Sequence, residues 1–121
     1  MTDKKQFGVW MDGYHATIVG TGNSGELVVH AHIKNELTPG NSNEHTAQNH
    51  EETLRHKFFK KITEHMQNAE HIHATGTGQA QEQFISYLKE TPQFKNAKMT
   101  ECTSNKMSDE KLLEFFGEKF N

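Results

Sequence analysis

The chain has 121 residues, and 32% of them are apolar, which suits one modest domain spanning residues 1–121. Its formal net charge of -3 excludes a protein that holds nucleic acid by overall positive charge, and its single cysteine excludes an internal disulfide framework. The sequence has neither an apolar run long enough to cross a membrane nor a secretory leader, so we expect a cytoplasmic protein.

The first elements along the chain are predicted to be three antiparallel strands. Residues 6–12 and 14–20 are apolar, β-type runs, and Asp12-Gly13 between them is typical of a tight hairpin turn. A second turn, over residues 22–25, leads into a strand over 26–34. Strict alternation along this third strand predicts that one apolar set shares a face: Leu27, Val29, Ala31 and Ile33.

Residues 35–50 are almost wholly polar, and we expect them to form a long mobile loop. The apolar period then changes to four residues, which predicts an amphipathic helix over 50–68. Its core stripe is Leu54, Phe58, Ile62 and Met66. The remaining elements are a strand over 70–75, a helix over 79–90, a strand over 97–102 and a helix over 111–120 capped by Ser108.

The order βββαβαβα predicts an α/β protein of the ribonuclease-H-like class, with a mixed five-stranded sheet and helices on both faces. Many proteins of this fold cleave nucleic acid with metals held by convergent carboxylates. Asp12 ends the first strand, but the fourth strand ends in Ala74-Thr75-Gly76 and offers no second carboxylate. We therefore expect no nuclease activity and assign Asp12 to the turn.

Two histidine pairs, His30/His32 and His71/His73, are the candidate metal ligands. Residues i and i+2 of a strand share a face, so each pair is expected to project its imidazoles together. The predicted strand order separates the third strand from the fourth, which argues against a shared metal site. We interpret these residues as surface histidines and expect no cofactor.

Two segments are candidates for contact with RNA or another anion. The first is the basic flank of the helix after the loop, formed by Arg55, Lys57, Lys60 and Lys61. The second is the turn Gly76-Thr77-Gly78, whose backbone amides precede a helix and suit a phosphate. A solvated helix face and a tight turn that needs glycine are the plain structural alternatives.

Several longer segments together resemble a known group of proteins. They are FGVWMDGYHATIV (7–19), HIKNE (32–36), EETLRHKFFKKITEHM (51–66) and EHIHATGTGQAQEQFISYL (70–88). They resemble the middle domain of eukaryotic and archaeal peptide-chain release factors and of Pelota, and short bacterial single-domain proteins of that superfamily known as translational machinery proteins. The resemblance covers nearly the whole chain and implies a role in translation.

In those release factors a Gly-Gly-Gln tripeptide, in the loop before the charged helix, promotes hydrolysis of peptidyl-tRNA. The matching loop here, 35–50, contains Gly40 alone, and no two glycines are adjacent anywhere in the sequence. The nearest spelling, Gly76-Thr77-Gly78-Gln79, matches a different segment, the junction after the fourth strand. A turn held between a buried strand and a helix cannot reach into a ribosomal active site, so we do not assign hydrolysis to Gln79.

The leading hypothesis is a non-catalytic domain that binds RNA or the ribosome through the basic helix flank and the adjoining loop. Two alternatives stay open. One is a divergent esterase acting on peptidyl- or aminoacyl-tRNA, and the other is a homo-oligomeric interaction module that pairs through the edge of the third strand.

Overall fold

The structure, a computed structural model, describes residues 5–22, 26–35 and 47–120. The element order matches the predicted one, with a short 3₁₀ helix added. The elements are β1 (Gln6–Met11), β2 (His15–Thr21), β3 (Leu27–Lys34), α1 (Ala47–Thr63), β4 (His71–Gly76), α2 (Gln79–Lys89), η1 (Pro92–Phe94), β5 (Lys98–Thr103) and α3 (Asp109–Phe120).

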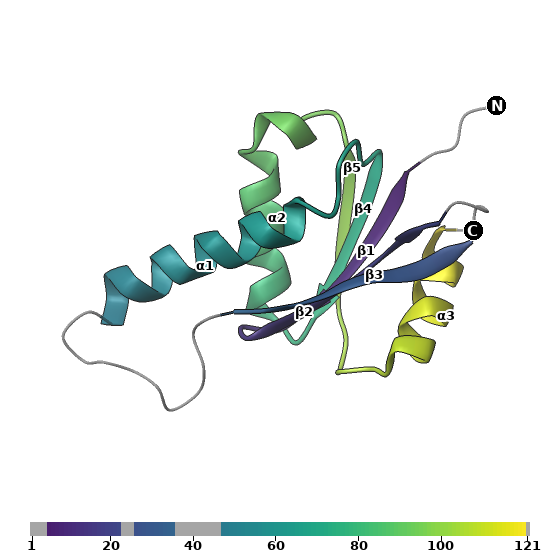
Figure 1. Ribbon diagram of the computed structural model, residues 1–121, viewed down its shortest axis with the longest axis horizontal. Coiled ribbons are helices and arrows are strands. Elements are labelled where there is room, and N and C mark those ends of the chain that lie inside the picture. The colour runs from purple at the N-terminus through teal and green to yellow at the C-terminus, as the bar shows by residue number, and fades with distance from the viewer. Residues whose placement is uncertain (1–4, 23–25, 36–46, 121) are drawn as a thin grey trace.

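The five strands form one mixed sheet in the order β3-β2-β1-β4-β5. The first three strands run antiparallel as a meander, whereas β4 lies parallel to both β1 and β5. Helices α1 and α2 lie on one face of this sheet and α3 lies on the other (Figure 1). The predicted ribonuclease-H-like architecture is therefore confirmed.

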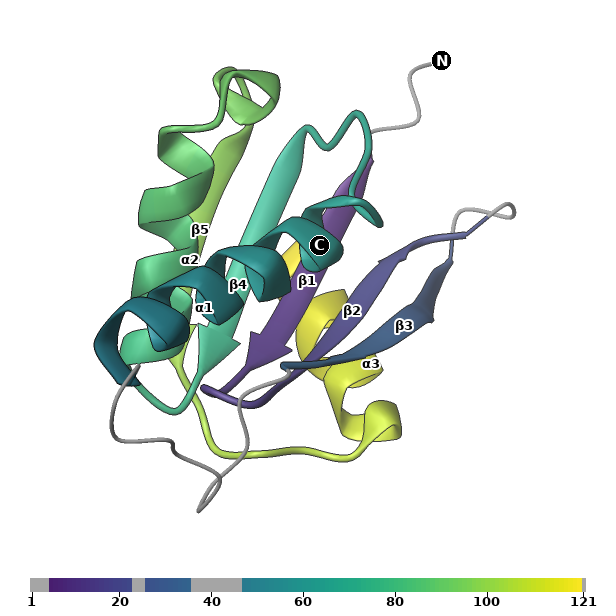
Figure 2. The ribbon, with the colours of Figure 1, turned by 60° about the vertical axis from the view of Figure 1, so that its left-hand side comes forward.

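Each face of the sheet has its own apolar core. Under α1 and α2, Phe7, Val9 and Ile18 from the sheet belong to one cluster with Phe58 of α1 and Phe84 of α2. Ile62 of α1 and Met66, which follows the helix, belong to the same cluster. Under α3, a smaller cluster is formed by Trp10, Val19, Leu112 and Phe116. The view in Figure 2 shows α1 crossing in front of the sheet while α3 lies behind it. None of the described helices is long and apolar enough to cross a membrane.

The predicted single apolar face of β3 is wrong, because a β-bulge interrupts the strand. Ile18 of β2 pairs with Ala31 and the next residue, Val19, pairs with Val29, so His30 is an extra residue on the bulged strand. One extra residue moves the side chains beyond it to the opposite face. Val29 consequently packs with the α3 cluster, whereas Ala31 packs with the core under α1 and α2.

The boundaries of α1 also differ from the prediction of 50–68. The helix begins at Ala47, so the predicted loop over 35–50 ends earlier than expected, and its residues 36–46 lie outside the described residues. The helix ends at Thr63, where the backbone tightens and the N–H of Met66 donates to the Thr63 carbonyl over 3.0 Å. Asn68 then adopts a left-handed backbone with φ 62°, which turns the chain toward β4.

Candidate nucleic-acid interface

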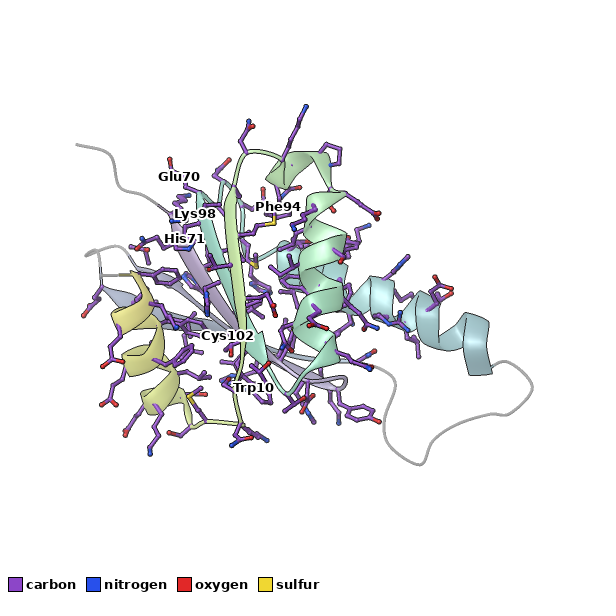
Figure 3. All side chains as sticks on the ribbon, turned by 180° about the vertical axis from the view of Figure 1, so that it is seen from behind. Trp10, Glu70, His71, Phe94, Lys98 and Cys102 are labelled. Atoms are coloured by element: carbon purple, nitrogen blue, oxygen red, sulfur yellow. The ribbon has the colours of Figure 1, made fainter. Side chains whose placement is uncertain are left out.

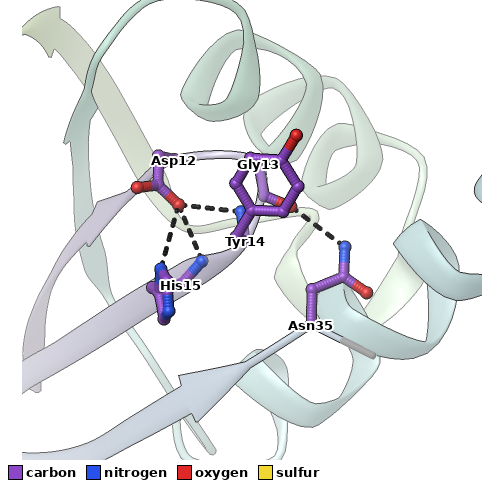
Figure 4. A network of polar contacts seen from close by, with 5 residues as sticks. All are labelled: Asp12, Gly13, Tyr14, His15 and Asn35. Carbon is purple, nitrogen blue, oxygen red and sulfur yellow. Dashed lines mark hydrogen bonds and ion pairs between the residues drawn. The ribbon is translucent and has the colours of Figure 1, made fainter. Parts of the chain in front are cut away.

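The turn between β1 and β2 is organised by one carboxylate. Asp12 Oδ1 accepts hydrogen bonds from the backbone N–H groups of Tyr14 and His15, both over 2.7 Å (Figure 4). The side-chain amide of Asn35, at the end of β3, donates to the Gly13 carbonyl over 3.1 Å. The turn is therefore tied to the edge of the sheet, and Asp12 has the structural role that the sequence indicated.

A cavity of about 330 Å³ lies beside this turn, between α1 and the start of α2. We call it the turn cavity. It brings together Arg55 of α1 and Gln79, the residue that follows the Gly76–Gly78 turn. The sequence had treated these as two separate candidate segments. The full lining is Asp12, Gly13, Tyr14, Asn35, Arg55, Phe58, Phe59, Gln79, Ala80 and Gln83.

Arg55 is the cation of the turn cavity. It is half-buried, and its neighbours Phe58 and Phe59 are almost fully buried. No acidic side chain forms an ion pair with Arg55 within the part of the chain that the structure describes. Because Arg55 is half-buried and forms no ion pair with an acidic side chain among the described residues, an anion from outside would interact with it strongly.

The lysines of α1 face away from this cavity. Lys57, Lys60 and Lys61 are exposed, and we call them the outer lysines. Arg55 and Lys57 are two residues apart, which is about 200° around a helix, so the two cations point in opposite directions. The predicted basic flank is thus divided between a cavity on one side of α1 and an open surface on the other.

Both glycines of the Gly76-Thr77-Gly78 turn have structural reasons for being glycine. A Cβ atom on Gly76 would collide with the Met11 carbonyl oxygen of the neighbouring strand. Gly78 has φ 153°, a backbone conformation that residues with side chains rarely adopt. Its N–H already donates to Gln81 Oε1 over 3.1 Å. Anion binding by Gly76, Thr77 and Gly78 therefore stays a prediction, and Thr77 is the exposed member.

The two candidate histidine pairs are arranged differently from each other. The bulge puts His30 and His32 on opposite faces, which corrects the expectation that they project together. The His30 ring lies 5.7 Å from the Phe7 ring under α1, whereas His32 Nε2 lies 3.0 Å from the carboxylate of Asp109 on α3. Among the described residues, no three histidine, cysteine or acidic side chains are placed to share a metal ion.

His71 and His73 do share a face, but His73 is not a surface residue. Only 5% of it is exposed, and its ring lies against Phe115 and Phe116 of α3. Figure 3 shows His71 and Cys102 on the side of the sheet that faces α3. Burial, and then the positive charges of Lys119 and His71, lower the pKa of His73 from 6.5 to about 4.

Comparison with solved structures shows which proteins share this fold. The Pelota protein of Thermoplasma acidophilum superposes over 94% of the chain with a TM-score of 0.65 and 16% sequence identity. The Pelota protein of Archaeoglobus fulgidus superposes over 95% (TM-score 0.61, 11% identity), and an archaeal translation termination factor over 97% (TM-score 0.61, 15% identity). The fold is that of a domain in these proteins. The resemblance read from the sequence is confirmed at the level of fold.

The chain spans about a third of the length of these relatives, namely 32%, 31% and 35% of each. The sequence matches no protein-family model and no curated protein. The Pelota-like fold therefore fixes the scaffold, while any activity has to be argued from the side chains that this chain places on it.

Sequence reasoning missed most of the turn cavity. The sequence placed Tyr14 in the strand over 14–20, Asn35 in the loop over 35–50 and Gln83 in the helix over 79–90, and it gave none of the three a role in a site. The one available signal was the spacing Gly78-x-x-Gln81, a capping pattern that fixes where α2 begins. That start places Gln79 and Gln83, which are four residues apart, on the cavity side of α2.

Proposed function

We propose that this protein is a translation-related domain that binds RNA or the ribosome through α1 and carries no catalytic activity of its own. The observation that carries the proposal is the placement of cations on both sides of one helix. The outer lysines lie on the open side and Arg55 lies in the turn cavity. The shared fold with Pelota and an archaeal translation termination factor supports a partner in translation.

The position of α1 suits contact with a large partner. Its first turns extend beyond the sheet (Figure 1), and the outer lysines in its second half are exposed to solvent. Three lysines within five residues give this face a local positive charge, although the whole chain has a net charge of -3. A local patch of this kind attracts the phosphates of RNA without binding polyanions over the whole surface.

The turn cavity adds groups that can contact bases or sugars. Tyr14 offers an aromatic ring, and Gln79 and Gln83 offer amide donors and acceptors. Single-stranded RNA is recognised by such rings and amides, whereas lysines contact its backbone. The proposal implies a cytoplasmic location, because ribosomes work there. Pairing of two copies through the edge of β3 stays a separate prediction.

The proposal is tested by reversing the charge of the outer lysines. The triple variant K57E/K60E/K61E is compared with K95E/K98E/K111E, which makes the same charge change at exposed lysines outside α1. We expect the α1 variant to bind a single-stranded RNA at least about tenfold more weakly. The slope of log K against log salt should also fall by about 2, because three phosphate contacts are lost.

Fluorescence anisotropy measures the affinity, and co-sedimentation with ribosomes measures the association in the presence of the natural complex. The control variant should sediment as the unmodified protein does. An equal loss of RNA affinity in both variants would show that binding depends only on net charge, and it would overturn the proposal. Absence of RNA and ribosome binding by the unmodified protein would overturn it as well.

A further inference from the structure

A second cavity, of about 220 Å³, lies on the opposite face of the sheet, beside the start of α3. We call it the α3 cavity. Its lining comes from β1, from the facing ends of β2 and β3, and from the segment that joins β5 to α3. It shares no lining residue with the turn cavity, so the two are separate sites.

Two lysines give the α3 cavity its charge. Lys34 lies at the end of β3 and Lys106 lies just before α3, and both are exposed at the rim. Neither forms an ion pair with an acidic residue within the described part of the chain. Two cations from separate segments, facing one small cavity, form a site for a single anionic group.

The one acidic residue of the cavity is already engaged. Asp109 Oδ1 and Oδ2 lie 3.1 Å and 3.0 Å from His32 Nε2, so both carboxylate oxygens are directed to the imidazole. His15, which also lines the cavity, lies with its Nδ1 atom 3.7 Å from Asp12 Oδ1. The Asp109 carboxylate keeps its negative charge, but the two lysines outnumber it, so the cavity lining carries a net positive charge.

The inner wall of the cavity is apolar. It includes Trp10, which is 3% exposed, and the partly buried Met107. The indole N–H of Trp10 donates to the Asn105 carbonyl over 3.1 Å, so its polar atom is already used. Only a small part of the indole is open to a ligand, and Met107 provides more of the apolar surface, which suits a hydrocarbon or ring rather than a sugar.

We propose that the α3 cavity binds a small organic phosphate monoester, with the phosphate between Lys34 and Lys106 and the apolar group against Trp10 and Met107. The volume sets the size of the ligand, because cavities for drug-sized molecules begin at about 300 Å³. A ligand with only one of the two groups would use half of the site. Inorganic phosphate would not cover the apolar wall, and an uncharged ring would leave the ammonium groups of Lys34 and Lys106 without an anion. The site needs both halves of the ligand.

The test uses phenyl phosphate, inorganic phosphate and phenol as probes. Trp10 is the single tryptophan of the chain, so intrinsic fluorescence reports on this cavity directly. We expect phenyl phosphate to change the fluorescence in a saturable manner and inorganic phosphate to bind at least about tenfold more weakly, because it gains no apolar contact. Phenol should give no saturable change.

The variant K34A/K106A should lose at least about tenfold in affinity for phenyl phosphate, because both charge-assisted contacts are removed. The control K95A/K111A removes two exposed lysines elsewhere and should bind as the unmodified protein does. K57E/K60E/K61E should also keep its affinity, which separates this site from the RNA surface.

Equal affinities for phenyl phosphate and inorganic phosphate would overturn the proposal, because they would indicate general attraction of anions. Equal affinities of the two double variants, or no saturable change with phenyl phosphate, would overturn it as well.

Discussion

His73 shows at the scale of one residue how a buried imidazole joins the sheet to α3. Its Nδ1 atom lies 2.6 Å from Thr100 Oγ1, and its Nε2 atom lies 3.3 Å from Cys102 Sγ. Both ring nitrogens thus have partners on β5, while the ring itself packs on Phe115 and Phe116. A neutral imidazole fits this position and a charged one does not.

Protonation of His73 is therefore expected to destabilise the fold in acid. The pKa is about 4 in the folded chain and 6.5 when unfolded, so the unfolded state binds the proton first as the pH falls. The stabilisation is complete above pH 6.5 and is lost as the pH falls toward 4. Between about pH 7 and about pH 4.5 the loss is about 2 kcal/mol.

Urea unfolding of the unmodified protein, His73→Gln and His65→Gln at both pH values measures this loss. His65 is exposed, so His65→Gln should keep the full pH dependence, whereas His73→Gln should lose about 2 kcal/mol of it. The same pH dependence in all three proteins would contradict the assignment to His73.

At the scale of the element, sequence pattern predicts a helix well when one face of it is apolar. Leu54, Phe58 and Ile62 of the predicted stripe are confirmed on the buried face of α1, because their period belongs to the helix itself and needs no knowledge of a partner. Met66 is buried too, but it follows the end of the helix. The face of β3 was not predictable in this way. The bulge at His30 depends on which residues of β2 lie opposite, and that register is set by the whole sheet.

The start of α3 gives a testable prediction at this scale. Ser108 Oγ accepts a hydrogen bond from the Lys111 N–H over 3.4 Å, so it satisfies one of the free amides of the first turn. Ser108→Ala should cost about 1 kcal/mol of stability. Ser86→Ala, on the exposed side of α2, is the matched control and should be neutral. Equal unfolding midpoints for the two variants would argue against a cap at Ser108.

At the scale of the whole molecule, α3 supplies half of the residues of the second core. Phe116 is fully buried, and it packs directly on β1 because Gly8 has no side chain at that point. Phe120, one turn later, is only half-buried. Phe116 and Phe120 therefore differ in how much they stabilise the packing of α3 against the sheet.

Replacing Phe116 and Phe120 in turn by alanine should show how much each contributes to the free energy of unfolding. Phe116→Ala is expected to cost about 3–5 kcal/mol, because it leaves a cavity against β1. Phe120→Ala should cost clearly less, because part of its ring is already in water. Chemical denaturation measures both, and equal costs would show that the cluster under α3 is packed more loosely than its burial indicates.

The candidate sites belong to this largest scale, which explains why the sequence showed only parts of them. The turn cavity joins Tyr14, Arg55 and Gln79, which are brought together by a hairpin, a helix and a helix start. Each residue has an ordinary local explanation, and only the packing of α1 against α2 and the sheet makes them neighbours. The sequence shows which residue types are present, but it does not show that these residues become neighbours in the folded chain.

The carboxylate of Asp12 links the turn cavity to the α3 cavity. A single oxygen atom fixes the amides of Tyr14 and His15, which border opposite sides of the sheet. A rotation of that one side chain would release both amides together. A mutation of Asp12 would therefore change the shapes of the turn cavity and the α3 cavity together.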